Sequence, residues 1–133
     1  MRTRKIVTSF LRFEGRILLL KRSGRVSTYR GKWAAVSGGL EKGETPLARA
    51  RKEIEEETGL KPRAFKIAKR GEPFSLEDRH LGIKWIIHPF LFTAKSGRIK
   101  LDWEHTAFRW VKPEELSRYP AVPKLYEALK RLL

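Results

Sequence analysis

The segment between Thr45 and Gly59 constrains the fold most, because it contains sequence signals for both ends of one helix. Thr45 is followed by Pro46, the usual order of an N-cap and a first helical residue. Gly59 supplies the stop, since glycine commonly ends a helix in the left-handed conformation, and Pro62 follows it. The sequence therefore predicts a helix of about 13 residues here.

Apolar and acidic side chains fall on different faces of this helix. At about 100° per residue, one apolar stripe is expected to face the core: Leu47, Ala50 and Ile54. A separate arc gathers three carboxylates: Glu53, Glu56 and Glu57. Glu55 points away from that arc and lies four residues after Arg51, a spacing that allows an ion pair. Three of the four clustered glutamates are therefore expected to converge.

Strands are predicted on both sides of the helix. Alternating, β-branched or aromatic stretches place them at residues 5–13, 16–22, 33–39, 63–71, 83–94, 96–101 and 108–111. Pro89 favours a bulge or an edge position for the strand 83–94. Loops are expected at 23–32 and 72–82, and further helices at 112–119 and 122–133. This order predicts the α/β class, with a mixed sheet covered by helices on both faces.

Length and composition indicate one globular domain. The chain has 133 residues, which suits a single domain with a real core. The absence of cysteine excludes disulfides and thiolate metal sites. No apolar run approaches the length of a membrane span and no signal-peptide pattern is present, so a cytoplasmic location without membrane contact is expected. Asn and Gln are absent and charged residues are dense, which indicates a thermophilic source.

The formal net charge of +15 predicts affinity for polyanions. Nucleotides, polyphosphates, nucleic acid and anionic lipid all fit this charge, and so does a simple solvated basic surface. Against this background the acidic arc of the helix has two interpretations. It is either a solvated face neutralised by neighbouring Lys and Arg, or a site for a hard divalent cation such as Mg²⁺ or Mn²⁺. An acidic metal site in a basic protein favours phosphate chemistry.

The glutamates are part of a longer pattern. The stretch GGLEKGETPLARARKEIEEETGL, residues 38–60, closely resembles the Nudix box, G-x5-E-x7-R-E-U-x-E-E-x-G-U, where U is aliphatic. The matching positions are Gly38, Glu44, Glu53, Ile54, Glu56, Glu57, Gly59 and Leu60. The flanking strand order also resembles the Nudix fold, which implies an α/β/α sandwich formed by a single domain over residues 1–133.

One box position departs from the family pattern. Lys52 stands where the family has an arginine, which normally holds the first catalytic glutamate through a forked ion pair. Lysine keeps the charge but lacks the fork, and the adjacent Arg51 faces elsewhere on the helix. Lys52 is therefore a catalytic candidate with an altered hydrogen-bond network expected around Glu53. The ligand positions are all present, so an active enzyme is still expected.

The resemblance implies a mechanism and a set of site residues. In Nudix hydrolases the box glutamates hold Mg²⁺ or Mn²⁺, here Glu53, Glu56 and Glu57, and the glycine-rich loop adds the carbonyl of Gly38. Water then attacks a phosphorus atom of a diphosphate linkage, and Glu53 is one candidate base. Glu44 is expected to support the loop and the start of the helix.

A further acid is expected outside the box. The segment LDWEHTAFRWVKPEEL resembles the part of diadenosine tetraphosphate hydrolases in which a Glu-His pair precedes a strand ending in Trp. Glu104 is therefore predicted as an additional metal ligand or base, with Asp102, Glu77 and Asp78 as alternatives. His105 has two interpretations, a phosphate ligand or a structural residue beside Trp103.

Substrate contacts are expected from two groups of residues. Basic side chains around the loop 23–32 are candidates for holding a polyphosphate: Arg22, Arg25, Arg30 and Lys32. Aromatic side chains are candidates for stacking on a base, with a core position as the alternative for each: Trp33, Phe74 and Trp85. The expected substrate is a nucleoside di- or triphosphate or a nucleoside diphosphate linked to another group. Hydrolysis of an RNA 5′ end and non-catalytic nucleotide sensing remain alternatives, and a homodimer is a candidate assembly.

Overall fold

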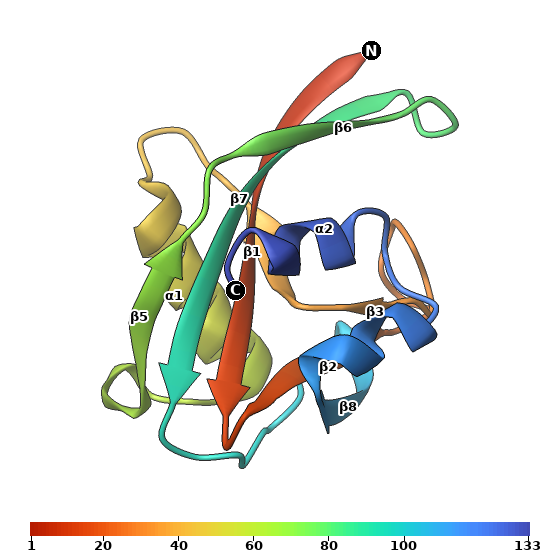
Figure 1. Cartoon of the computed structure of the whole chain (residues 1–133). Coiled ribbons are helices and arrows are strands. Elements are labelled where there is room, and N and C mark those ends of the chain that lie inside the picture. Colours follow the sequence, from red (N-terminus) through yellow and green to blue (C-terminus); the bar gives the residue numbers. More distant parts are fainter.

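The computed structural model describes all 133 residues and contains one mixed sheet with an α-helix on each face (Figure 1). The strands are β1 (Arg2–Phe13), β2 (Arg16–Arg22), β3 (Trp33–Ala34), β4 (Val36–Gly39), β5 (Phe65–Arg70), β6 (Phe74–Asp78), β7 (Ile83–Ala94) and β8 (His105–Val111). The helices are α1 (Pro46–Thr58) and α2 (Leu125–Lys130), with 3₁₀ turns η1 (Pro62–Ala64) and η2 (Pro113–Arg118).

The centre of the sheet is formed by β1 and β7, which run parallel from Arg2 beside Ile83 to Arg12 beside Thr93. All other pairs are antiparallel. The main strand order is β3-β2-β1-β7-β5, and β4, β8 and β6 pair with β1, β2 and β7 respectively. The predicted mixed sheet and α/β class are therefore confirmed.

Alternating side chains of the central strands fill two separate cores. On one face, Leu11 and Leu18 pack with Ala50 and Ile54 of α1. On the other face, Phe10, Ile17 and Leu91 of the same strands pack with Leu116 of η2 and with Leu125 and Leu129 of α2. Because successive residues of a strand point to opposite faces, one set of strands supplies both cores. These two cores make the predicted α/β/α sandwich.

Helix α1 begins and ends where the sequence predicted. The hydroxyl of Thr45 accepts a hydrogen bond from the Ala48 N–H at 3.1 Å, and Pro46 occupies the first turn. Gly59 ends the helix at φ 75°, and its N–H donates to the Glu55 carbonyl. Ile54 is fully buried, so its truncation to alanine would cost about 2–5 kcal/mol. This anchoring fixes which helix face the glutamates occupy.

Several predicted elements differ from the structure. Strand β6 lies inside the predicted loop 72–82, where it forms a hairpin with β7. No strand forms within 96–101; there the Lys100 N–H donates to the Thr58 carbonyl, and Ile99 and Leu101 pack against the core beside α1. The expected helix 112–119 is a 3₁₀ turn, and the final α-helix covers only Leu125–Lys130.

The edge position expected from Pro89 is wrong, because β7 has strands on both sides. Pro89 pairs with Thr8 of β1 on one side. On the other side it lies between the last β5 pair, at Phe90, and the first β6 pair, at Ile87. Its carbonyl accepts from the Gly71 N–H in this gap. The missing proline N–H therefore faces a break between two partner strands.

No helix of the structure has both the length and the apolar character of a membrane span.

Candidate active site

The site is built where β4 meets α1. Gly38 of β4 lies directly against the side chain of Glu53, so that a Cβ added at this glycine would overlap the glutamate carboxylate. Glycine is required here because the backbone approaches the acid so closely. Glu53 is buried at 8 % exposure and also borders the main cleft of the protein.

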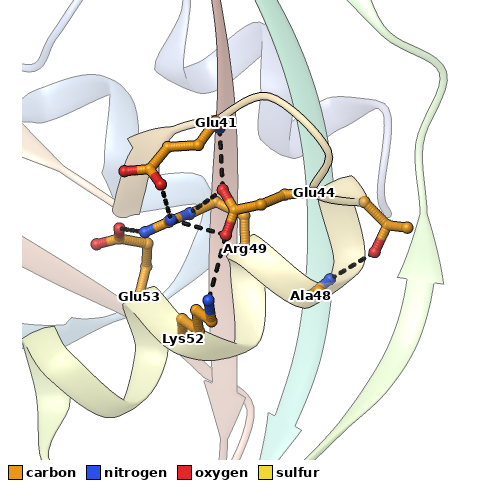
Figure 2. Close-up of polar contacts among 7 residues, drawn as sticks. Glu41, Glu44, Ala48, Arg49, Lys52 and Glu53 are labelled. Atoms are coloured by element: carbon orange, nitrogen blue, oxygen red, sulfur yellow. Dashed lines mark hydrogen bonds and ion pairs between the residues drawn. The ribbon is translucent and has the colours of Figure 1, made fainter.

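A guanidinium group holds Glu53 from the other side (Figure 2). Arg49 lies one turn before Glu53 on α1, and its Nη1 donates to Glu53 Oε1 at 2.9 Å. The same side chain donates through Nε and Nη2 to the two oxygens of Glu44, at 2.9 and 2.7 Å. Glu44 Oε1 also accepts the Glu41 N–H at 2.9 Å. The loop before α1 and the helix itself are therefore joined through one arginine.

The charges in this cluster alter the ionisation of its members. Burial opposes ionisation of Glu44, but the Glu41 N–H and the Arg49 guanidinium hold the pKa of Glu44 below its ordinary value. Hydrogen bonding to Glu44 raises the pKa of Arg49. Lys52, by contrast, has a side chain that is 61 % exposed and reaches only Glu44, at 3.4 Å. The structure thus does not bring Lys52 to Glu53.

Glu57 is the most deeply buried carboxylate of the arc, at 1 % exposure. Its Oε1 accepts the Ser37 N–H at 3.4 Å and lies 3.6 Å from His105 Nε2, whereas its Oε2 has no partner. Burial, and then the neighbouring Glu53 carboxyl, raise the pKa of Glu57 well above its ordinary value. An unpartnered buried carboxylate oxygen is costly in a protein interior.

His105 lies between two acids. Its Nδ1 is 2.9 Å from Asp102 Oδ1, and burial lowers the pKa of the imidazole. At 6 % exposure this histidine is not open to a phosphate, so its structural interpretation is the one the geometry favours. Asp102 also accepts the backbone N–H of Glu104 at 3.2 Å. The Asp102–His105 contact therefore shapes the loop that carries Glu104.

Glu104 borders the same cleft as Glu53. Its backbone carbonyl accepts the Ser23 N–H at 2.7 Å, which ties its loop to the segment after β2. Burial, and then the charges of Asp102 and Glu53, raise the pKa of the Glu104 carboxyl. Three carboxylates from two distant segments of the chain, Glu53, Glu57 and Glu104, thus influence one another. Glu53 and Glu104 border the cleft, and Glu57 is buried behind its lining.

The cleft has a volume of about 1090 Å³ and runs from these acids toward the β6–β7 hairpin. Basic side chains line it: Arg2, Arg4, Lys5, Arg22 and Lys124. Arg22 is fixed by two hydrogen bonds to Thr28, and burial lowers its pKa. A cleft of this size with acids at one end and cations along its walls can hold a polyanionic ligand with its charged groups near the acids.

A contact among Tyr29, Asp78 and Trp85 includes two residues that line the cleft, Tyr29 and Trp85. Tyr29 donates from its hydroxyl to Asp78 Oδ2 at 2.6 Å and accepts from Trp85 Nε1 at 3.2 Å. Burial, followed by the Asp78 hydrogen bond, raises the pKa of Tyr29 to about 12. Tyr29 has a φ of 50°, unusual for a residue with a side chain. This contact joins the loop 23–32 to the β6–β7 hairpin.

Some predicted site residues lie elsewhere. Glu56 is exposed and does not border the cleft. Arg25 stacks on Trp103 at 5.5 Å, Arg30 donates to the Val26 carbonyl, and Lys32 and Glu77 are exposed. Trp33 is a core residue packed edge-on against Tyr119, and Phe74 lies beneath Arg131. Neither of these two aromatics borders the cleft, whereas Trp85 does.

Sequence reasoning missed Arg49, Tyr29 and the basic start of β1. The spacing of four residues between Arg49 and Glu53 is a readable helix ion-pair signal. The contribution of Tyr29 depends on Asp78 and Trp85, which lie far along the chain and give no local signal. The expected Arg51–Glu55 pair is not among the ion pairs of the structure.

The acidic residues suit a hard divalent cation in their chemistry. No group of three or more His, Asp or Glu side chains is already assembled at metal-binding spacing. Like charges repel one another, so an open arrangement is expected of carboxylates with no cation between them. The unpartnered Oε2 of Glu57 and the raised pKa values of Glu57 and Glu104 fit a site in which a cation offsets this repulsion.

Comparison with known proteins agrees with this architecture. The NUDIX domain family model matches residues 1–132. The chain is 31 % identical over 126 residues to the nucleoside triphosphatase NudI of Escherichia coli, covering 90 % of this chain and 89 % of that protein.

Solved structures show the same similarity. The MutT protein of Methanosarcina mazei matches with a TM-score of 0.80 at 25 % identity, over 98 % of this chain and 92 % of that one. The MutT Nudix hydrolase of Burkholderia pseudomallei matches with a TM-score of 0.78 at 25 % identity, over the whole of both chains. Together with the box residues around α1, these matches show that the chain belongs to the Nudix hydrolase family.

Proposed function

We propose that this hydrolase cleaves a diphosphate linkage in a nucleoside triphosphate, with Mg²⁺ or Mn²⁺ bound at the acidic end of the cleft. The observation that carries the proposal is the buried Glu57 carboxylate, which has an unpartnered oxygen and lies next to Glu53, a residue that borders the basic cleft. The similarity to a nucleoside triphosphatase favours this substrate class over other nucleoside diphosphate derivatives.

Glu53 and Glu57, with the carbonyl of Gly38, are the proposed ligands, and the exposed Glu56 on the same arc is a further candidate. Glu104 is either an additional ligand or the base, and the base is the role preferred here. A divalent cation held there would lower the pKa of the attacking water and offset phosphate charge. Arg22 and Lys124 border the cleft and would bind the remaining phosphate oxygens. Trp85 is the one predicted aromatic at the cleft and would contact the base.

Glu104 is the preferred proton acceptor among the acids. Its carboxyl has no side-chain partner in the hydrogen-bond network, whereas one oxygen of Glu53 is engaged by Arg49. Glu53 is then a ligand whose position is fixed before substrate binds.

A phosphate-release screen tests this proposal. The eight common ribo- and deoxyribonucleoside triphosphates, nucleotide sugars and dinucleoside polyphosphates would be compared with Mg²⁺, Mn²⁺ or EDTA. We expect triphosphates to be hydrolysed fastest and EDTA to abolish release. Glu57→Gln should lower kcat by more than about 100-fold, whereas the matched Glu55→Gln variant, changed on the exposed side of α1, should keep wild-type activity. Full activity of Glu57→Gln would refute the proposed metal site.

A second candidate function is hydrolysis at the 5′ end of RNA. The observation that favours it is the start of β1, where Arg2, Arg4 and Lys5 are exposed, line the cleft and lie on the part of the sheet that projects beyond the body (Figure 1). A polynucleotide held there would show turnover that falls steeply between about 50 and 200 mM salt. The triple alanine variant of these residues should then slow cleavage of triphosphorylated RNA but not of a free nucleotide. Equal effects on both substrates would exclude this candidate.

A further inference from the structure

The residue that holds Glu53 is not the residue at the box position for arginine. Lys52 occupies that position, yet its side chain is 61 % exposed and its one charged contact is Glu44 at 3.4 Å. Arg49, three residues earlier on the same helix, makes the contact to Glu53 at 2.9 Å. Figure 2 shows the guanidinium lying between Glu44 and Glu53, while Lys52 contacts Glu44 alone.

The contacts of Arg49 need a guanidinium rather than an ammonium. Its Nε and Nη2 bind the two oxygens of Glu44 as a fork, and Nη1 remains to bind Glu53. Nη2 also lies 3.4 Å from Glu41 Oε2. A planar group with donors on three nitrogens can satisfy two carboxylates at fixed angles, which a lysine ammonium cannot do in the same geometry. The side chain is 11 % exposed, so water competes weakly for these bonds.

Glu53 is therefore confined on two sides. Gly38 lies against its carboxylate from β4, and Arg49 binds Oε1 from within α1. The same guanidinium fixes Glu44, whose Oε1 holds the Glu41 N–H of the loop between β4 and α1. Movement of Arg49 would release the loop and the acid together.

We propose that Arg49 is the positioning residue of this active site, taking over from one helical turn earlier the task that Lys52 does not perform at the box position. Arg49 acts through Glu53 and does not contact the substrate. Its effect falls on the placement of one metal-binding carboxylate and of the adjoining loop. The inference rests on the proposed function in one respect, because it treats Glu53 as a metal ligand.

Matched single variants test it. Arg49→Met removes the fork and the charge, Arg49→Lys restores only the charge, and Lys52→Met is the control three residues away. We expect Arg49→Met to lower kcat about 10- to 100-fold, the range for loss of a residue that orients a metal ligand. Its KM should stay within about threefold, because Arg49 does not line the cleft. Arg49→Lys should recover part of this loss, and Lys52→Met should stay within about twofold of wild type.

Two further measurements separate positioning from folding and from the choice of substrate. Calorimetric titration with Mn²⁺ alone, well below the melting temperature of each variant, should show affinity lowered by Arg49→Met and unchanged by Lys52→Met. A crystal structure of Arg49→Met should show the Glu53 carboxylate displaced from Gly38. An active wild type with kcat unchanged in Arg49→Met, an equal loss in Lys52→Met, or an undisplaced Glu53 would each overturn the inference. A wild type that hydrolyses no nucleotide would instead refute the proposed function, and the Glu53 position would still decide the role of Arg49.

Discussion

Replacing Glu57 by glutamine should stabilise the metal-free protein while removing its function. The Glu57 side chain is 1 % exposed, its Oε2 has no partner, and the Glu53, Glu104 and Asp102 carboxylates add further negative charge around it. Each unit by which burial raises a carboxyl pKa corresponds to about 1.4 kcal/mol of stability lost once the group ionises. Glutamine keeps the shape and the polar atoms but removes the charge and its repulsion, so the free energy of unfolding should rise by at least about this amount, or roughly 4 °C in Tm per kcal/mol.

A bound cation should make the wild type more stable than the Glu57→Gln variant. A ligand that binds only the folded state adds about 2.7 kcal/mol at one hundred times its Kd. The wild type should gain this stability in Mn²⁺ or Mg²⁺, and the Glu57→Gln variant should gain little. The assay is thermal unfolding in EDTA and across a metal titration, with Glu55→Gln as the control, because Glu55 lies exposed on the opposite side of α1. The control should follow the wild type in both conditions.

The pH dependence of the free energy of unfolding is a second test of the destabilising effect of Glu57. Burial raises the folded-state pKa of Glu57 above its ordinary value of 4.5, so the folded protein binds this proton more tightly than the unfolded chain. In EDTA, the contribution of Glu57 to stability is fully present below pH 4.5 and is lost as pH rises through the folded-state pKa. Glu57→Gln should lack this decline. The reasoning is refuted if the variant in EDTA at pH 8 is no more stable than wild type and keeps the same pH slope.

Three other substitutions probe the parts that surround these acids. Gly38→Ala should lower kcat by at least about tenfold with a folded circular-dichroism spectrum, because its Cβ overlaps the Glu53 carboxylate; wild-type kcat would contradict the close approach. Tyr29→Phe should raise KM and lower the free energy of unfolding by about 0.5–1.5 kcal/mol, through loss of the bond to Asp78. Steady-state kinetics and urea unfolding measure both effects, and unchanged values in both would contradict them. Thr45→Ala should cost about 1 kcal/mol in urea unfolding with kcat preserved at low temperature, since only the helix cap is lost.

Local sequence signals predicted helix α1 and the face of it that carries the glutamates. The caps at Thr45 and Gly59 and the buried stripe through Ile54 depend only on residues within α1, so the acidic arc could be placed from the sequence. The contact of Arg49 with Glu53 could also have been predicted, because the two residues are four positions apart on the helix. The family pattern instead points to Lys52, which in the structure contacts Glu44 but not Glu53.

Contacts between residues far apart in the sequence explain the features that were predicted wrongly or missed. Trp33 follows a basic loop, and this position suggested a substrate contact. In the structure its backbone N–H donates to the Pro120 carbonyl and its ring packs on Tyr119. Strand β6 is short and is flanked by charged residues, so its alternation of Phe74 and Leu76 with polar residues is a weak signal, and its pairing with β7 shows it to be a strand. The basic start of β1 becomes a cleft wall for the same reason, since β7 extends alongside it as far as Ile83. These placements depend on partners that no short window of sequence contains.

The parallel pairing of β1 with β7 also determines when the active site can exist. The first strand finds its partner only after Ile83–Thr93 is available, so the chain must close a long loop before its central ladder can form. The cleft is completed later still, because Leu125 and Ala128 of α2 border it. High contact order of this kind places folding on a scale of about milliseconds to seconds. A nascent chain that already contains all of α1 therefore has every box glutamate but no assembled site, and the proposed metal binding would begin only near the end of folding.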